Sequence, residues 1–192
     1  ALDAFTMRGI GHNIPFLSAV MEHDRFISGN ITTAFIDEEY QEGFRGVTAS
    51  PARKRHLGMI MAAAACDEMH RIASLETAPT HPRYDDNSNR QIVQFANADT
   101  GAHDANEDLE IGITRSDDGR FKITAPPEAK TDIHLVFDRK PSHPRLHILL
   151  TEDGETTEYL CQLWRQQDRW HLYYRGISLC AHVRALHIAA LA

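Results

Sequence analysis

Histidine is the residue type in this chain that most invites a chemical interpretation, because twelve of its 192 residues are histidines. Neutral imidazole is a frequent ligand of zinc and of other transition metals. The histidines are scattered, however, and they form neither an H-E-x-x-H motif nor a Cys/His pair at zinc-finger spacing. His81 and His143 precede prolines in loop-like segments, so solvated or hydrogen-bonded histidines explain the pattern better than a metal site does.

Clustered carboxylates are a second candidate for chemistry, because two neighbouring acids with different pKa values can act as general acid and general base. The clusters comprise Asp85, Asp86, Asp104, Glu107 and Asp108. They fall in polar, loop-like stretches, where solvation accounts for them. Serine catalysis has no support either, since no serine stands in a G-x-S-x-G elbow.

Composition is that of an ordinary globular protein, with 42% hydrophobic and 24% charged residues. The formal net charge of −7 argues against a nucleic-acid partner, which needs a clustered basic surface. No apolar run approaches the roughly 18 residues of a membrane span, so a membrane partner is not expected. Cys66, Cys161 and Cys180 are far apart and form no C-x-x-C pair, which favours buried thiols in a reducing compartment.

One long helix is predicted over residues 51–75, with Ser50 as its N-cap and Pro51 at its first position. The middle of this segment is apolar on nearly every side, which is typical of a helix that is buried on every side. No second helix of similar length follows it. A sheet must therefore surround it.

From residue 91 to residue 184 the apolar period changes to two, which indicates strands. Asp-Gly pairs at 118–119 and 153–154 predict tight hairpin turns. Residues 91–95 form a possible further strand, and seven apolar sets define the others: Leu109, Ile111, Ile113; Phe121, Ile123; Ile133, Leu135, Phe137; Leu146, Ile148, Leu150; Tyr159, Cys161, Leu163; Trp170, Leu172, Tyr174; and Ile177, Leu179, Ala181, Val183. The predicted fold is α+β: an antiparallel barrel-like sheet wrapped around one long central helix, preceded by short helices.

The first 44 residues carry short helical segments and then a connector without periodicity. They resemble the end of the biotin carboxylase domain in alpha subunits of biotin-dependent acyl-CoA carboxylases, nearest to the propionyl-CoA carboxylases. The resemblance is looser in the barrel. It rests on Arg8-Gly9-Ile10, His12 to Leu17, Gly29-Asn30, Glu39 to Phe44, Tyr174-Arg175-Gly176 and Val183 to Leu186.

The resemblance implies a middle piece of a larger multidomain enzyme. Residues 1–39 would end the biotin carboxylase domain and 40–50 would form a hook-like connector. Residues 51–184 would form an interaction domain, with a loop at 76–90 between the long helix and the strands. Residues 185–192 would begin a linker toward a biotin carrier domain. No Met-Lys-Met biotinylation motif occurs in the chain, so no cofactor is expected here.

The implied role is non-catalytic: docking the biotin carboxylase subunit onto the carboxyltransferase beta subunit. The whole enzyme would use biotin, ATP, bicarbonate and magnesium or manganese to carboxylate an acyl-CoA. Its expected location is the bacterial cytoplasm, or the mitochondrial matrix of a eukaryote, with the cytoplasm preferred. The alternative function is a stand-alone β-barrel module that binds a small apolar ligand.

Five connector residues are the predicted partner-binding residues, because an aromatic side chain and an arginine often anchor interfaces. They are Tyr40, Gly43, Phe44, Arg45 and Gly46. The opposing interpretation is a passive linker. The resemblance also implies that Thr33 and Phe35 form one wall beside the nucleotide site of the whole enzyme. The alternative, a helix start that packs on the neighbouring domain, explains the two residues better.

Overall fold

The computed structural model describes residues 2, 5–7, 12–74, 90–97, 103, 107–116, 118–124, 133–138 and 144–186. Several expectations lie outside the described residues. They are the loop at 76–89, the acidic residues Asp85, Asp86 and Asp104, the histidines at 81, 143 and 187, the Arg8-Gly9-Ile10 segment, and the tail at 187–192.

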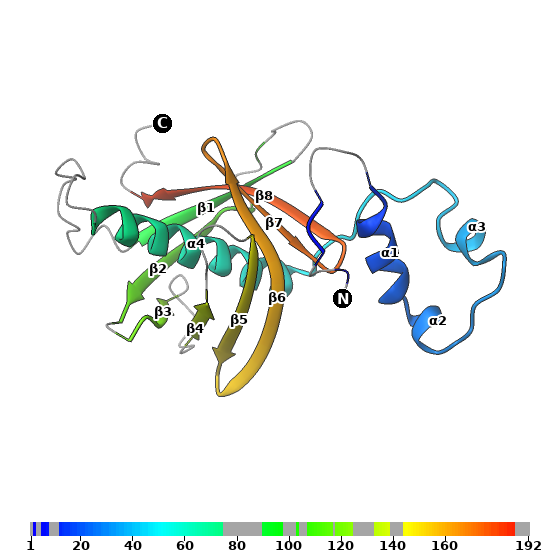
Figure 1. The fold of residues 1–192 in the computed structure, drawn as a ribbon, viewed down its shortest axis with the longest axis horizontal. Helices are drawn as coiled ribbons and strands as arrows, with labels where there is room; N and C mark the ends of the chain where they lie inside the picture. The colour runs from blue at the N-terminus through cyan, green and yellow to red at the C-terminus, as the bar shows by residue number, and fades with distance from the viewer. Residues whose placement is uncertain are drawn as a thin grey trace.

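Eight antiparallel strands form a closed barrel, in which each strand pairs with the next and β8 pairs with β1 (Figure 1). All seven strands expected from the apolar sets are present, and the possible strand at 91–95 is confirmed as β1. The strands are β1 (Arg90–Ala96), β2 (Leu109–Arg115), β3 (Phe121–Thr124), β4 (Ile133–Asp138), β5 (Arg145–Glu152), β6 (Glu155–Gln166), β7 (Arg169–Tyr174) and β8 (Ile177–Ala185).

Two of the hairpins turn through two residues that both have positive φ angles. Asp153 and Gly154 have φ of 51° and 85°, and Arg175 and Gly176 have φ of 46° and 81°. Such a turn matches the right-handed twist of the strands that it joins. The Asp-Gly hairpin expected at 153–154 is therefore confirmed, whereas the Arg-Gly turn carried a weaker sequence signal.

The long helix α4 (Pro51–Ala73) ends two residues earlier than expected. Ser50 caps it as predicted, because its side chain accepts a hydrogen bond from the Arg53 backbone N–H. All ten residues from 57 to 66 are buried. They share one hydrophobic core with inward-facing residues from every one of the eight strands. The expected packing of a long helix against an antiparallel sheet is thus confirmed.

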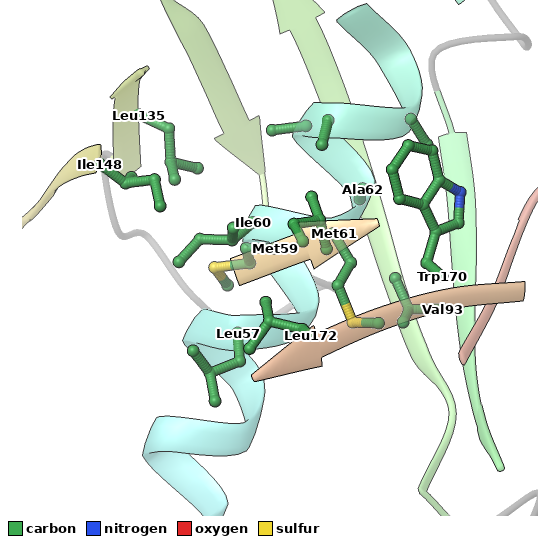
Figure 2. Close-up of a cluster of buried hydrophobic side chains, with 14 of the residues drawn as sticks. Leu57, Met59, Ile60, Met61, Ala62, Val93, Leu135, Ile148, Trp170 and Leu172 are labelled. Carbon is green, nitrogen blue, oxygen red and sulfur yellow. The ribbon is translucent and has the colours of Figure 1, made fainter. Parts of the chain in front are cut away.

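Side chains on opposite sides of α4 reach different strands. Figure 2 shows Ile60 directed toward Leu135 and Ile148, and Met61 directed toward Val93. Where the helix carries small residues, the sheet approaches closely. A Cβ added at Gly58 would lie 2.9 Å from both the Leu109 and the Phe95 side chains. Ala62, Ala63 and Ala64 are likewise fully buried.

The first two turns of α4 carry three consecutive cations, which reach three different parts of the barrel wall. A positive charge at a helix N-terminus is disfavoured by about 0.3–1 kcal/mol, so partners on the wall must offset that cost. The pairs are Arg53 over the Tyr174 ring at 5.6 Å, Lys54 Nζ to Glu107 Oε2 at 2.5 Å, and Arg55 to Glu152 Oε1 at 2.6 Å.

Glu152 also anchors His56 in a chain of half-buried hydrogen bonds. A carboxylate only accepts, so His56 Nε2 donates to Glu152 at 2.7 Å, and Nδ1 accepts from the Tyr159 hydroxyl at 2.7 Å. Burial raises the pKa of Tyr159, which keeps its hydroxyl proton at neutral pH. Burial alone would raise the pKa of Glu152, but the hydrogen bonds from Arg55 and His56 outweigh it and lower that pKa.

The charges are reversed toward the other end of α4. There the helix presents the acids and the strands present the arginines. Asp67 pairs with Arg115 of β2 at 3.7 Å, and Glu68 pairs with Arg165 of β6 at 3.1 Å. The two ends of the helix thus contact wall residues of opposite charge.

Three short helices precede the barrel, as expected for residues 1–39: α1 (Ile14–Met21), α2 (Asp24–Ile27) and α3 (Phe35–Glu39). Asn13 occupies the N-cap position of α1 but makes no side-chain cap hydrogen bond. Among the described helices, none is long and apolar enough to cross a membrane.

Enlarging an alanine in the buried part of α4 tests how closely the sheet packs on it. We expect Ala64→Leu to lower the free energy of unfolding by roughly 1–3 kcal/mol, because overpacking forces side chains and backbone apart. Ala52 lies exposed in the first turn of the same helix, so Ala52→Leu is the matched control and should change little. Urea unfolding measures both. Equal effects would show that the sheet does not enclose the middle of the helix.

The lowered pKa of Glu152 gives a pH dependence with a defined sign. A carboxyl with a lower pKa when folded contributes stability above its unfolded pKa and loses it as the pH falls through the folded pKa. Glu152→Gln should therefore cost stability at pH 7, and the difference from wild type should shrink below about pH 4.5. Glu158→Gln, at an exposed ion pair with His147, should cost less. Unfolding curves at pH 3.5 to 7 measure this, and a pH-independent difference would contradict it.

Candidate functional site

The connector at 40–50 runs from α3 back to α4 without regular secondary structure (Figure 1). Its aromatic residues do not extend freely. The Phe44 ring packs 5.5 Å from Phe16 of α1 and 6.1 Å from Tyr40, and Phe16 and Tyr40 meet edge to face at 5.1 Å. Phe44 is half-buried in this arrangement. The Phe44 ring therefore fixes the connector to α1.

Arg45 is one of the connector side chains that face outward, together with Gln41, Glu42 and Thr48. The Arg45 side chain is 78% exposed and pairs with the similarly exposed Glu42 at 3.0 Å. An ion pair of this kind contributes little to stability, so it leaves the guanidinium available to a partner. Gly43 and Gly46 flank this region with φ of 78° and 95°. No atom lies within 4 Å of a Cβ added at either glycine, so backbone conformation and not crowding requires them.

The other two predicted site residues behave differently from each other. Phe35 is only 5% exposed, with His23 against its edge at 5.1 Å and the Arg25 guanidinium over its ring at 5.3 Å. It lies 6.3 Å from Tyr40, which joins it to the connector aromatics. Thr33 is exposed. We call Phe16, Phe35, Tyr40 and Phe44 the aromatic platform.

Arg25 packs on one member of the platform, Phe35, and the sequence alone did not single it out. Its Nη1 donates to Glu38 at 2.8 Å and to Glu39 at 2.7 Å, and its Nε donates to the Asn30 carbonyl at 3.2 Å. The hydrogen bond from Arg25 lowers the pKa of Glu39. One guanidinium thus ties α2 to α3 and to the turn between them. Charge alone did not distinguish it from the other arginines of the chain.

Helix α1 is joined to the outside of the barrel at the β7–β8 hairpin. The Tyr173 hydroxyl donates to the buried Ser18 hydroxyl at 3.0 Å, and Arg175 pairs with Glu22 at 3.1 Å. A Cβ added at Gly176 would lie 3.1 Å from the Pro15 carbonyl oxygen. The hairpin turn therefore touches the helix backbone, and α1 is packed against the barrel.

Three further described histidines each contact one nearby side chain. His103 contacts Asp108 and His147 contacts Glu158, both at 2.5 Å, and His171 stacks on Trp164. Among the residues that the structure describes, no group of three or more His, Cys, Asp or Glu side chains is arranged to hold a metal ion.

Known proteins with similar sequences are carboxylase chains, although no family model matches. The chain is 34% identical over all 192 residues to the propionyl-CoA carboxylase alpha chain of Ruegeria pomeroyi, of which it spans 26%. The mitochondrial propionyl-CoA carboxylase alpha chain of Caenorhabditis elegans is 47% identical over 51 residues, 27% of this chain and 7% of the relative. A pyruvate carboxylase from Aspergillus terreus is 47% identical over 38 residues, 20% of this chain and 3% of the relative.

By these similarities the chain corresponds to a region of a carboxylase subunit. The chain is a homologue of the propionyl-CoA carboxylase alpha chain along its whole length, as the resemblance in its first 44 residues indicated. It spans about a quarter of that relative.

The contact between α1 and the hairpin turn can be tested with a pair of matched glycines. Gly154 and Gly176 are both the second residue of a two-residue turn with positive φ, but a Cβ at Gly154 meets open space. We expect Gly154→Ala to cost roughly 1–2 kcal/mol for the left-handed backbone. Gly176→Ala should cost more in urea unfolding, because its Cβ would also press on the Val47 side chain at 2.9 Å and on the Pro15 carbonyl of α1 at 3.1 Å. Equal costs would mean that neither α1 nor the connector is packed against the turn.

Proposed function

We propose that this chain is the interaction region of a propionyl-CoA carboxylase-like alpha subunit, and that it docks the biotin carboxylase part onto a carboxyltransferase beta subunit. The observation that carries the proposal is the homology over all 192 residues. The exposed Arg45 supports the proposal as a point of contact, because the connector that carries it is packed on α1 through Phe44.

The proposed domain division follows the described elements. Residues 1–39, with α1 to α3, end the biotin carboxylase domain, and 40–50 form the connector. Residues 51–184 form the interaction domain, in which the sheet is wrapped around α4 as a central helix. The burial of ten consecutive helix residues supports this arrangement. Residues 185–192 begin the linker toward the biotin carrier domain.

Within the connector, we assign different roles to the predicted residues. Arg45 makes the direct contact with the beta subunit, because its guanidinium is exposed and arginine is common at interface hot spots. Gly43 and Gly46 permit the backbone turns on either side of it. Tyr40 and Phe44 form the base of the contact through the aromatic platform, so they act mainly by positioning Arg45.

Thr33 and Phe35 are assigned to the nucleotide-facing side of the biotin carboxylase part. Thr33 is exposed and can line a wall, whereas Phe35 is covered and supports that wall by packing on Tyr40. The nucleotide site itself would need residues from the rest of the subunit.

The whole enzyme would carboxylate biotin with ATP, bicarbonate and magnesium or manganese, and the carboxyl group would then pass to an acyl-CoA on the beta subunit. These activities belong to the proposal for the whole protein, since this chain spans only 26% of its relative. We place the enzyme in the bacterial cytoplasm.

A ligand-binding barrel is the less favoured function. Such a module needs interior space for a small apolar ligand. Here Leu57, Met59, Ile60 and Met61 of α4 are fully buried among the inward side chains of all eight strands, where that ligand would have to lie.

Substitutions in the connector test the docking role. The 192-residue chain is immobilised, and binding of the carboxyltransferase beta subunit from the same organism is measured by biolayer interferometry. Arg45→Ala should weaken binding about thirtyfold, which corresponds to about 2 kcal/mol for a hot-spot residue. The stability of the chain should be unchanged, because Arg45 is exposed.

Arg120→Ala is the matched control, since Arg120 is also exposed and pairs with a local acid, Asp118, at 3.2 Å. It should leave binding unchanged. Phe44→Ala should lower both binding and thermal stability, because it removes part of the aromatic platform. Full affinity of Arg45→Ala and Phe44→Ala would show that the connector is a passive linker.

A further inference from the structure

The connector contains six consecutive residues, 44–49, whose backbone is unpaired. A turn closes before them, where the Gly43 N–H donates to the Tyr40 carbonyl at 2.9 Å. Helix α4 begins after them, where the Lys54 N–H donates to the Ser50 carbonyl at 2.8 Å. Within the described part of the chain, no group forms a hydrogen bond with the backbone of residues 44–49. This stretch therefore carries a row of backbone donors and acceptors that only solvent or a partner can satisfy.

The second half of the stretch has the side-chain pattern of a β-strand. Val47 and Ala49 are half-buried and pack against the hydrophobic core, whereas Thr48 and Ser50 are exposed. Ser50 is extended, with φ of −61° and ψ of 154°. Alternation with a period of two is typical of a strand that has one covered face. The segment lies outside the closed barrel and pairs with none of the eight described strands.

This pattern fixes the direction of the unpaired backbone groups. In an extended chain the N–H and C=O groups lie at right angles to the side chains, and neighbouring residues direct theirs to opposite sides. Because Val47 and Ala49 face the core, the backbone groups run along the surface of the molecule. They point neither into the core nor straight out into solvent.

A groove of about 560 Å³ runs beside the segment on that surface. Val47, Thr48 and Ala49 all line the groove, so at least every second residue of the segment directs its N–H and C=O groups to that side. The end of β1 and the start of β8 contribute the barrel residues of the lining, which are Phe95, Ala96, Asn97, Ser178 and Leu179, and Lys54, His103 and Glu107 also line it. A second extended chain has room there.

The chemistry of the segment favours an extended partner over a helical one. A helix satisfies its own backbone groups, so it would leave the row at 44–49 unpaired. An extended chain offers N–H and C=O groups at the same spacing, as in the recognition of peptides by strand addition. Arg45, which is 78% exposed at one end of the row, favours a partner with an acidic side chain opposite it.

We propose that residues 44–49, which we call the connector strand, pair through their backbone with an extended, acid-containing segment of the carboxyltransferase beta subunit. The proposal rests on the docking role given above and adds the mode of recognition. Backbone pairing supplies the length of the contact, and Arg45 selects the partner segment. Residues of one parity, either 45, 47 and 49 or 44, 46 and 48, make the hydrogen bonds.

Hydrogen exchange of the 192-residue chain, resolved to single residues by mass spectrometry, tests the pairing. In the free chain the amides of the connector strand should exchange rapidly, because they are unpaired. With the beta subunit from the same organism in excess, the amides of one parity should slow by about tenfold or more, and those of the other parity should slow less.

Two proline substitutions test the same alternation by binding. Thr48→Pro and Ala49→Pro each remove one backbone N–H, and the two groups point to opposite sides of the strand. The substitution at the protected parity should weaken beta-subunit binding about tenfold, and the other should change it little. Both variants should melt close to the wild type, since neither N–H is bonded in the free chain. Thr48→Ala, which keeps the N–H, is the control and should bind normally.

The outcomes separate this proposal from the docking function on which it rests. No binding of the beta subunit to the wild-type chain would overturn both. Binding without protection of the connector strand would overturn the backbone pairing alone and leave docking through side chains. Equal effects of the two prolines, whether both weaken binding or neither does, would also overturn the pairing, because a paired strand presents only one of its two sides.

Discussion

The burial of the middle of α4, residues 57–66, is the constraint on which the rest of the structure depends. Ten consecutive residues of this helix are buried, and every strand contributes to the core around them. A helix that is apolar all round cannot be covered by a flat sheet on one face. A closed barrel solves this problem, and it also removes the exposed strand edges that an open sheet of eight strands would leave.

The charges on α4 give the helix a direction within this arrangement. Lys54 and Arg55 meet carboxylates near the start of the helix, and Asp67 and Glu68 meet arginines farther along it. A helix inserted in the opposite direction would bring its cations toward Arg115 and Arg165. The cations at the start also oppose the helix dipole, so local helix stability does not explain them. The ion pairs between these cations and the barrel explain why the cations are there. The same pairs favour one direction of α4 inside the barrel, which the apolar middle of the helix alone would not determine.

The sequence predicted the barrel well because its signals are local. Alternating apolar residues, the Asp-Gly turn and the Ser-Pro cap each depend on a few neighbouring residues, and each was found where expected. The candidate site was harder to predict. That Phe44 packs inward while Arg45 faces outward depends on Phe16, which lies 28 residues earlier in the chain. The role of Arg25 depends on acids that the fold brings next to it. That the Gln91 amide has no hydrogen-bond partner among the described residues is likewise visible only in the folded structure.

One sequence signal of the tertiary structure was available but was not used. In β7 the inward residues are Trp170, Leu172 and Tyr174, so Tyr173 must face outward, yet it is only 7% exposed. An outward aromatic in a barrel strand indicates that something covers the barrel there, and α1 does so through Ser18. Because α1 is fixed to the barrel wall and α4 is fixed inside the core, the segment from α2 to residue 50 is held at both ends. A connector held in this way would lose less freedom on binding the beta subunit proposed as its partner.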